Sequence, residues 1–278
     1  MQETFDMIKK FSKDNELRLS AGTLRNYGYV LNCFFADMQK GYREIKTEDV
    51  EEWMAGLMEG GIRVSTIAYR LTCLKSFYSY LREEGLISEN LVSELALPKR
   101  GDNIPYYLER EQLQKLRDLV KNDPLERAVV ETLYTTGVRV SELIRIRLSD
   151  VNWETKHIDI KDGKGKKERT VLFNDECKLW LEEYLKSRCE DSQYLFLGKQ
   201  GKPMYRFLLN YYFKKYKKKL GIKITPNTMR HTFAAHLAEN GMPLRHIQVL
   251  LGHDNPETTR IYTKLYSHVR KKKYDRYI

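Results

Sequence analysis

The sequence of 278 residues predicts a mainly α-helical protein with a small β-sheet or hairpin in its second domain. Apolar residues recur with helical spacing through most of the chain. Strict alternation of apolar and polar residues is confined to two short stretches, 157–160 and 170–173, with Lys161, Asp162, Gly163, Lys164 and Gly165 following the first. The two stretches therefore predict the strands of a hairpin or small sheet.

The first part of the chain is expected to form a bundle of four or five helices. One helix has an apolar stripe made by Tyr27, Val30, Leu31, Phe34, Phe35 and Met38. A second helix starts after Thr47 and ends at Gly60 and Gly61, and a third follows Ser65 and ends at Gly85. The stretch Phe5–Phe11 adds another helix. The aromatic and methionine side chains of these stripes are expected in the core.

A linker divides the chain into two domains. The stretch 97–105 holds two prolines, a glycine and few apolar residues. We therefore expect a helical domain at 1–98, a linker at 99–106 and a mixed α+β domain at 107–278. Helical patterns in the last domain cover 108–122, 125–147, 175–188, 204–220, 227–240 and 243–251.

The net charge of +11 is concentrated in the second domain. Residues 1–100 hold 14 basic and 15 acidic side chains, whereas residues 101–278 hold 35 and 23. A concentrated positive field favours a polyanion such as nucleic acid as the partner. The alternative, on charge alone, is a solubilising surface without a ligand.

Several protein classes are excluded by composition. No apolar run approaches the roughly 18 residues that cross a bilayer, so no membrane partner is expected. The N-terminal residues mix acidic with apolar side chains, unlike a signal peptide. The four cysteines, Cys33, Cys73, Cys177 and Cys189, show no zinc-ligand spacing, and free thiols suggest the reducing cytoplasm.

Three features of the basic domain are candidates for chemistry. Arg139 lies in Gly-Val-Arg-Val-Ser-Glu-Leu at 137–143, where Gly137 opens a turn and Glu142 can support the guanidinium. Arg230 lies near the start of a helix, and Tyr262 follows the segment Leu-Leu-Gly-His at 250–253. Taken singly, each has an ordinary explanation: a surface arginine, a packed tyrosine or a histidine at a helix end.

Taken together and in order, these features resemble the tyrosine recombinase (phage integrase) family, most closely its compact Xer-like members. The resemblance covers essentially the whole chain, and its specific part is the 137–143 box, the Gly-Lys-Gly at 163–165 and the segment 227–262. It implies a helical core-binding domain and a catalytic domain that close around duplex DNA as a clamp. It also implies site-specific recombination, as in Xer-like resolution or the integration and excision of a mobile element.

The resemblance assigns roles to five residues. Tyr262 would attack a backbone phosphate to form a 3′-phosphotyrosine, with Arg139 and Arg230 clamping the phosphate oxygens. Lys164 would protonate the leaving 5′-oxygen, and His253 would hydrogen-bond a phosphate oxygen or the tyrosine hydroxyl. No metal or other cofactor is expected, because the arginines take the place of cations and the covalent bond conserves energy.

The basic residues around Lys164 are expected to hold DNA. These are Lys161, Lys166, Lys167 and Arg169. They could also lower the pKa of Lys164. The alternative is that Lys164, like its neighbours, only neutralises phosphates.

One position departs from the family pattern. The arginine box usually reads His-x-x-Arg, whereas residue 227 is Asn. An amide can donate a hydrogen bond but cannot take a proton, so a slower enzyme is expected. His231, one helical turn further on, could partly substitute, although a buried structural role is the simpler explanation.

The resemblance further implies four subunits on two DNA sites, as a homotetramer or with a related recombinase. The tail Thr263–Ile278 would dock onto the neighbouring protomer; the alternative is that it folds back on its own chain. Two other functions remain open at this point. One is a sequence-specific DNA-binding regulator with weak or no catalysis, and the other is a type IB topoisomerase.

Overall fold

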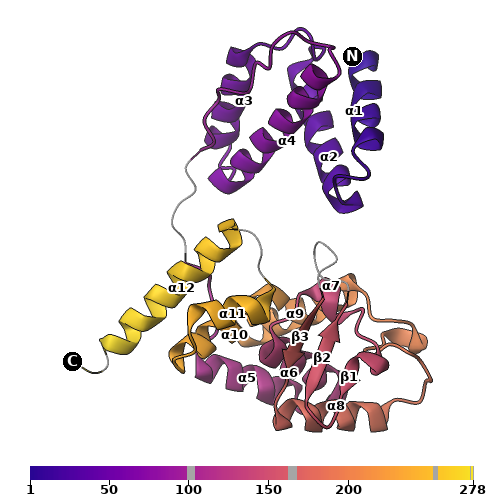
Figure 1. Ribbon diagram of the computed structural model, residues 1–278, viewed down its shortest axis with the longest axis vertical. Coiled ribbons are helices and arrows are strands. Elements are labelled where there is room, and N and C mark those ends of the chain that lie inside the picture. Colours follow the sequence, from indigo (N-terminus) through magenta and orange to yellow (C-terminus); the bar gives the residue numbers. More distant parts are fainter. Residues whose placement is uncertain (99–103, 162–167, 253–255, 276, 278) are drawn as a thin grey trace. The chain divides into compact units, whose positions relative to one another are not determined.

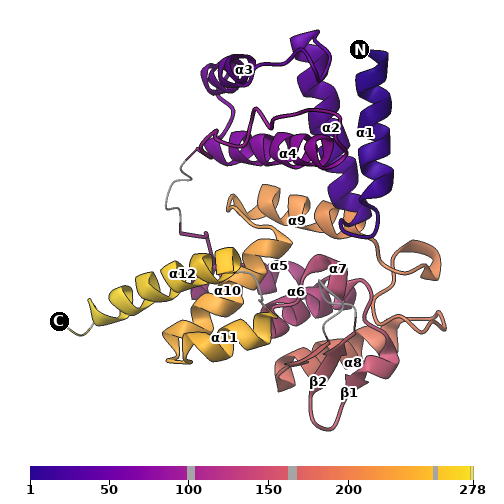
Figure 2. The same cartoon turned by 45° about the horizontal axis from the view of Figure 1, so that its top comes forward.

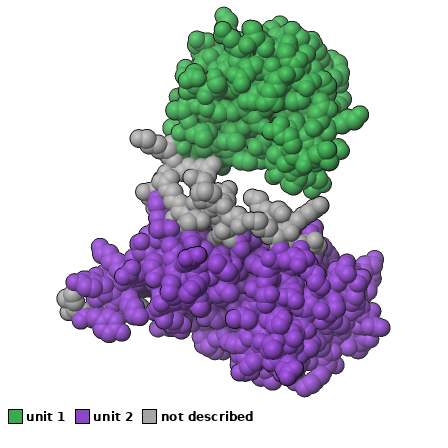
Figure 3. Space-filling view, in the orientation of Figure 1, with its two compact units in different colours: residues 1–102 green, residues 103–278 purple. Residues whose placement is uncertain are grey.

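The chain folds into two compact units, residues 1–102 and 103–278 (Figures 1 and 3). The computed structural model describes residues 1–278 except 99–103, 162–167, 253–255, 276 and 278, and except the side chains of 199 and 256–261. The boundary between the units falls inside the predicted linker 99–106, most of which lies outside the described residues. The finer domain limits therefore stay a prediction.

The first unit is a bundle of helices, as its apolar stripes predict. Its helices are α1 (Gln2–Asp14), α2 (Ala21–Met38), α3 (Thr47–Glu59) and α4 (Val64–Glu83). The Ser20 hydroxyl caps α2 by accepting a hydrogen bond from the Thr23 backbone N–H at 3.1 Å. Phe11, Phe35 and Phe77 are fully buried and meet edge to face in the core. These aromatic side chains are core, as expected.

The second unit is a layer of helices with a small sheet at one side (Figure 1). Its longer helices are α5 (Arg110–Val120), α6 (Pro124–Thr136), α8 (Asp175–Ser187), α9 (Arg206–Leu220), α10 (Pro226–Glu239), α11 (Leu244–Leu251) and α12 (Pro256–Tyr274). The buried helix α6 is central and packs against both α8 and α10. Among the described residues, no helix is long and apolar enough to cross a membrane.

The sheet has three antiparallel strands in the order β1–β2–β3. Strand β1 (Val151–Asn152) pairs with β2 (His157–Ile160), which pairs with β3 (Arg169–Leu172). Ile158 lies opposite Val171, and both side chains are fully buried, because alternate residues of the two strands face the helices. The mainly helical fold with a small sheet is thereby confirmed.

The helical pattern predicted over 125–147 is divided in two, which corrects the prediction. Helix α6 ends at Thr136, Gly137 adopts a left-handed conformation with φ of 61°, and the short helix α7 (Val140–Leu143) follows. Glycine adopts this conformation without strain and ends the helix there. The apolar residues keep their helical spacing on both sides of Gly137, and the pattern alone therefore does not show the break. The break brings Arg139 to the N-cap of α7.

The C-terminal helix α12 packs on its own unit. It lies beside α10 and α11 in both ribbon views (Figures 1 and 2). Leu265 and Val269 are each 1% exposed and belong to a cluster with Phe233 and Ile247. Lys272 Nζ forms an ion pair with Glu109 Oε1 at 2.6 Å. In this single chain the tail is therefore folded back, the arrangement that the sequence left as the alternative.

Candidate active site

The turn after α6 aims Arg139 toward α11. The Arg139 backbone N–H donates to Glu142 Oε2 at 2.7 Å, and its Nη1 donates to Glu142 Oε1 at 2.8 Å. Its Nη2 donates to the Gly252 carbonyl at 3.1 Å. The Arg139 side chain remains 27% exposed. The guanidinium is thus fixed in direction, on a side chain that remains partly exposed.

Glu142 anchors two arginines at once. Its side chain is 2% exposed, and Arg169 from β3 donates from Nη1 and Nη2 to the two carboxylate oxygens at 3.0 and 2.7 Å. Burial alone would raise the pKa of Glu142, but the hydrogen bonds from Arg169 and Arg139 outweigh it and lower the pKa to about 2. Glu142 is therefore ionised at neutral pH and holds both guanidinium groups.

Arg230 lies in the interior, 3% exposed, on α10. Its Nη1 donates to the Gly137 carbonyl and its Nη2 to the Leu251 carbonyl, both at 2.6 Å. Burial and the nearby charge of Arg139 lower the pKa of Arg230 to about 10, while Tyr262 and Glu142 act in the opposite direction. The guanidinium is thus still charged at neutral pH, and it ties the turn at Gly137 to the end of α11.

Tyr262 lies on α12 against these arginines and is 3% exposed. Burial raises the pKa of its phenol, whereas the charge of Arg230, a hydrogen bond with Arg230 and the charge of Arg139 favour the phenolate. The net pKa remains above the usual value of 10.0. Tyr262 is therefore a neutral phenol at rest, next to groups that stabilise negative charge on its oxygen.

Two residues of α10 form a chain of hydrogen bonds with Tyr262: His231 contacts Tyr262, and Asn227 contacts His231. The Tyr262 Oη hydrogen-bonds with His231 Nδ1 at 3.0 Å, and His231 Nε2 with Asn227 Nδ2 at 3.0 Å. Burial and then the charge of Arg230 lower the pKa of His231 to about 4. The imidazole is therefore neutral at physiological pH.

The structure thus gathers three of the predicted catalytic residues, Arg139, Arg230 and Tyr262. It also brings in Arg169, which was expected to contact DNA and here builds the frame around Glu142, with its Nε donating to the Leu250 carbonyl at 3.1 Å. Lys164, Lys166, Lys167 and His253 lie outside the described residues. The sequence left His231 open as a partial substitute for the missing histidine, with a buried structural role as the simpler explanation, and the structure places it in contact with Tyr262.

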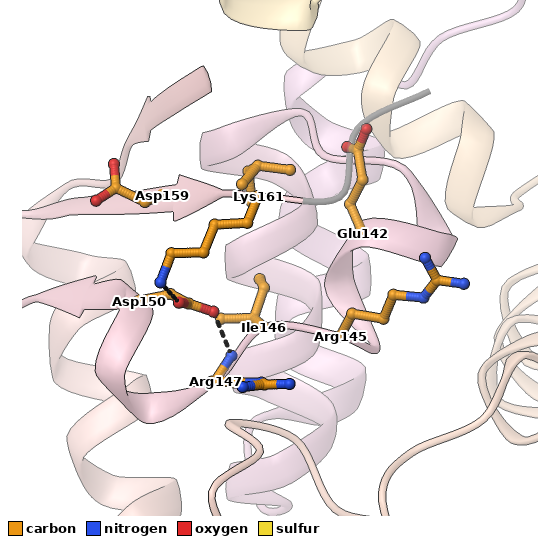
Figure 4. Close-up of a pocket in the computed structure, with 8 residues that line it drawn as sticks. Glu142, Arg145, Ile146, Arg147, Asp150, Asp159 and Lys161 are labelled. Atoms are coloured by element: carbon orange, nitrogen blue, oxygen red, sulfur yellow. Dashed lines mark hydrogen bonds and ion pairs between the residues drawn. The ribbon is translucent and has the colours of Figure 1, made fainter. Parts of the chain in front are cut away.

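A small polar pocket of about 230 Å³ lies beside Glu142 (Figure 4). Arg145, Arg147, Asp150, Asp159 and Lys161 contribute its charged side chains. Lys161 points toward Asp150, with Nζ and Oδ1 2.5 Å apart. Lys161, one of the predicted DNA contacts, is therefore an exposed cation at the end of β2, with an acidic partner in the unbound chain.

Comparison with known proteins agrees with this arrangement. Residues 106–268 match the phage integrase family, and residues 14–85 match the phage integrase N-terminal SAM-like domain. The tyrosine recombinase XerA of Pyrococcus horikoshii (strain OT-3) is 34% identical over 267 residues, which cover 94% of this chain and 89% of that protein. The tyrosine recombinase XerC of Bacillus pumilus (strain SAFR-032) is 34% identical, with 89% of this chain and 87% of that protein covered.

A similar fold occurs in the solved structure of the XerH site-specific recombinase bound to palindromic difH substrate. The TM-score is 0.77 at 21% sequence identity, with 96% of this chain and 83% of that chain covered. The sequence matches span both units, and the residues gathered around Tyr262 lie within the matched range. The chain therefore belongs to the phage integrase family and is a tyrosine recombinase, an enzyme of site-specific DNA recombination.

Proposed function

We propose that this recombinase cleaves duplex DNA by attack of the Tyr262 hydroxyl oxygen on a backbone phosphorus. The new bond joins Oη to phosphorus as a 3′-phosphotyrosine, and the bond from phosphorus to the 5′-oxygen breaks. The leaving oxygen keeps the electron pair and takes a proton to become a 5′-hydroxyl. Rejoining reverses these steps with the 5′-hydroxyl of a partner strand. The contact of the buried Tyr262 phenol with Arg230 is the observation that carries the proposal.

The two arginines supply the positive charge that the phosphate needs. Arg230 is buried, so its charge acts through a poorly screening medium, and Arg139 is partly exposed at the edge of the same site. Guanidinium groups held in advance by carbonyls and by Glu142 need little reorganisation as charge develops on the phosphate oxygens. Two more residues complete the proposed catalytic set. Lys164 is the acid that protonates the 5′-oxygen, and His253 is a further hydrogen-bond donor.

DNA is the proposed partner of both units, and the excess of basic residues in 101–278 supports this. Lys161, Lys166 and Lys167 are assigned to phosphate contacts, with the cytoplasm as the compartment. We further assign four subunits to two DNA sites. In that assembly the α12 surface around Leu265 and Val269 would pack on a neighbouring protomer instead of its own.

Duplexes tiled from the DNA that flanks the gene provide the test. Each is nicked so that cleavage releases a short fragment and traps the protein on the DNA. We expect a covalent band that resists denaturant, forms in EDTA and is selective for one sequence. Selective binding without a covalent band in any duplex would contradict the proposal and indicate a DNA-binding regulator. Relaxation of supercoils without sequence preference would indicate a topoisomerase.

A further inference from the structure

Three side chains form a continuous hydrogen-bonded row from the exposed surface of α10 to the buried phenol of α12. Asn227 is exposed, His231 is half-buried and Tyr262 is buried. The two contacts along the row are both 3.0 Å long, and the rings of His231 and Tyr262 are 5.6 Å apart between centroids. A histidine nitrogen thus lies at hydrogen-bond distance from the oxygen that must lose a proton when it attacks.

We propose that His231 is the general base for Tyr262 and that Asn227 is the positioning residue that fixes its tautomer. This assignment rests on the proposed function, because it concerns the proton of the same nucleophile. Within the described part of the chain, Arg230 and Arg139 also act on the phenol, from α10 and from the turn before α7. They are cationic donors at neutral pH and cannot accept the proton.

The proton moves in a closed cycle. Before attack, the Nε2 of the neutral imidazole carries the hydrogen and Nδ1 presents its lone pair to the Tyr262 hydroxyl. As Oη bonds to phosphorus, the phenol proton moves to Nδ1 and gives an imidazolium. On rejoining, the bond between Oη and phosphorus breaks, and Nδ1 returns the proton to the phenolate oxygen. The proton for the 5′-oxygen is separate and comes from the acid on the other side of the phosphorus.

Asn227 decides which tautomer forms. With the side-chain oxygen toward Nε2, the amide accepts the Nε2 hydrogen and leaves Nδ1 free to act as the base. With Nδ2 toward Nε2, as in the structure, the amide donates instead, and Nδ1 carries the hydrogen. A half-turn of the amide converts one arrangement into the other. Because Asn227 is exposed, this rotation breaks and forms hydrogen bonds with water and does not disturb core packing.

The charges around His231 make its basicity depend on whether a phosphate is bound. Burial and the charge of Arg230 hold the imidazole neutral in the unbound chain, so its lone pair is available at physiological pH. A phosphate bound by Arg230 and Arg139 would offset their positive charge. The basicity of His231 would then rise at the moment when the nucleophile needs it.

Single-turnover cleavage of the trapping duplex by His231→Asn tests the base. The asparagine amide can keep a hydrogen bond to Tyr262 but cannot take its proton. We expect cleavage to slow by about 10²-fold or more, with DNA affinity unchanged, and the rate to recover partly as the pH rises. His246→Asn, a change at an exposed histidine of α11, is the matched control and should cleave at the wild-type rate.

Two further measurements separate this base from the leaving-group acid and from a structural role. A duplex with sulfur at the bridging 5′ position needs no proton on the leaving group, so it should not restore cleavage by His231→Asn. Free imidazole should partly restore cleavage by His231→Ala, even if that variant is less stable. Asn227→Asp should cleave faster than Asn227→Leu, because a carboxylate accepts the Nε2 hydrogen.

Two kinds of result would overturn the proposal in distinct ways. If the wild type cleaves and His231→Asn stays within threefold of it, or is restored by the sulfur duplex, His231 is not the base. Equal rates for the two Asn227 variants would remove the positioning role. If the wild type forms no covalent complex on any duplex, the proposed function itself fails and this assignment fails with it.

Discussion

Arg169 and Glu142 form a bidentate ion pair that joins strand β3 to helix α7. Glu142 also holds Arg139, so one buried carboxylate orients a residue of the site and fixes the strand beside it. Strand β3 is therefore linked through Glu142 to Arg139, the arginine proposed to clamp the phosphate.

Glu142→Gln should lower both stability and activity. The substitution leaves two guanidinium groups without their buried counter-charge, for which a loss of about 3 kcal/mol in unfolding free energy is expected. Urea unfolding of a Trp53→Phe background measures it, because Trp153 and Trp180 then report on the second unit alone. Glu154→Gln, at an exposed position, should change stability little.

The stabilisation by Glu142 should also depend on pH. The folded state lowers the pKa of Glu142 from 4.5 to about 2, so the unfolded chain binds the proton more readily. The contribution is therefore complete above about pH 4.5 and is lost as the pH falls toward 2. The stability difference between wild type and Glu142→Gln should shrink over this range. A difference that stays constant would contradict the ion-pair explanation.

Gly137→Ala should be much more harmful than Gly221→Ala. Both glycines end a helix in the left-handed conformation, at φ of 61° and 67°. A Cβ at 137 would overlap Phe233 Cδ1, whereas a Cβ at 221 meets nothing within 4 Å. Gly221→Ala should cost about 1–2 kcal/mol for the backbone alone. Gly137→Ala should cost about 1–3 kcal/mol more in the same unfolding measurement, and equal costs would contradict the close approach.

Arg230→Lys should reduce cleavage about 10²–10³-fold while DNA affinity changes little. A lysine keeps the charge but cannot donate to the Gly137 and Leu251 carbonyls as a fork while facing a phosphate. Arg188→Lys is a matched control, because Arg188 also donates to backbone carbonyls but between α8 and the following segment. Single-turnover cleavage by the two variants tests the difference, and similar rates would argue against a catalytic Arg230.

Exchange of α12 between protomers can be detected by cross-linking. Glu109→Cys and Lys272→Cys replace an ion pair within one chain, and Cys33 and Cys189 are changed to serine to avoid side reactions. A short bismaleimide should link the two positions within single chains of the free protein. On DNA carrying two sites we expect links between chains. Links only within single chains under both conditions would show that the tail stays on its own unit.

The sequence predicts which residues form this site better than it predicts the contacts between them. Arg139, Arg230 and Tyr262 are recognisable because their order and surrounding motifs are specific. The apolar periodicity continues on both sides of Gly137 and so predicted one helix over 125–147, although the glycine itself indicated a turn. The row from Asn227 to Tyr262 depends on how α12 packs against α10, and no local pattern encodes that long-range contact. For the same reason the ion pair of Arg169 with Glu142 could not be predicted from the sequence.

The most direct test is to identify the amino acid that carries the DNA. The trapped covalent complex is digested with nuclease and then trypsin, which releases residues 261–264 and 265–270 as separate peptides because Arg260, Lys264 and Arg270 are cleavage points. Mass spectrometry should find the nucleotide on the 261–264 peptide, which contains Tyr262, and Tyr262→Phe should give no complex. A nucleotide on Tyr266 or any other residue, or a complex that persists in Tyr262→Phe, would contradict the account.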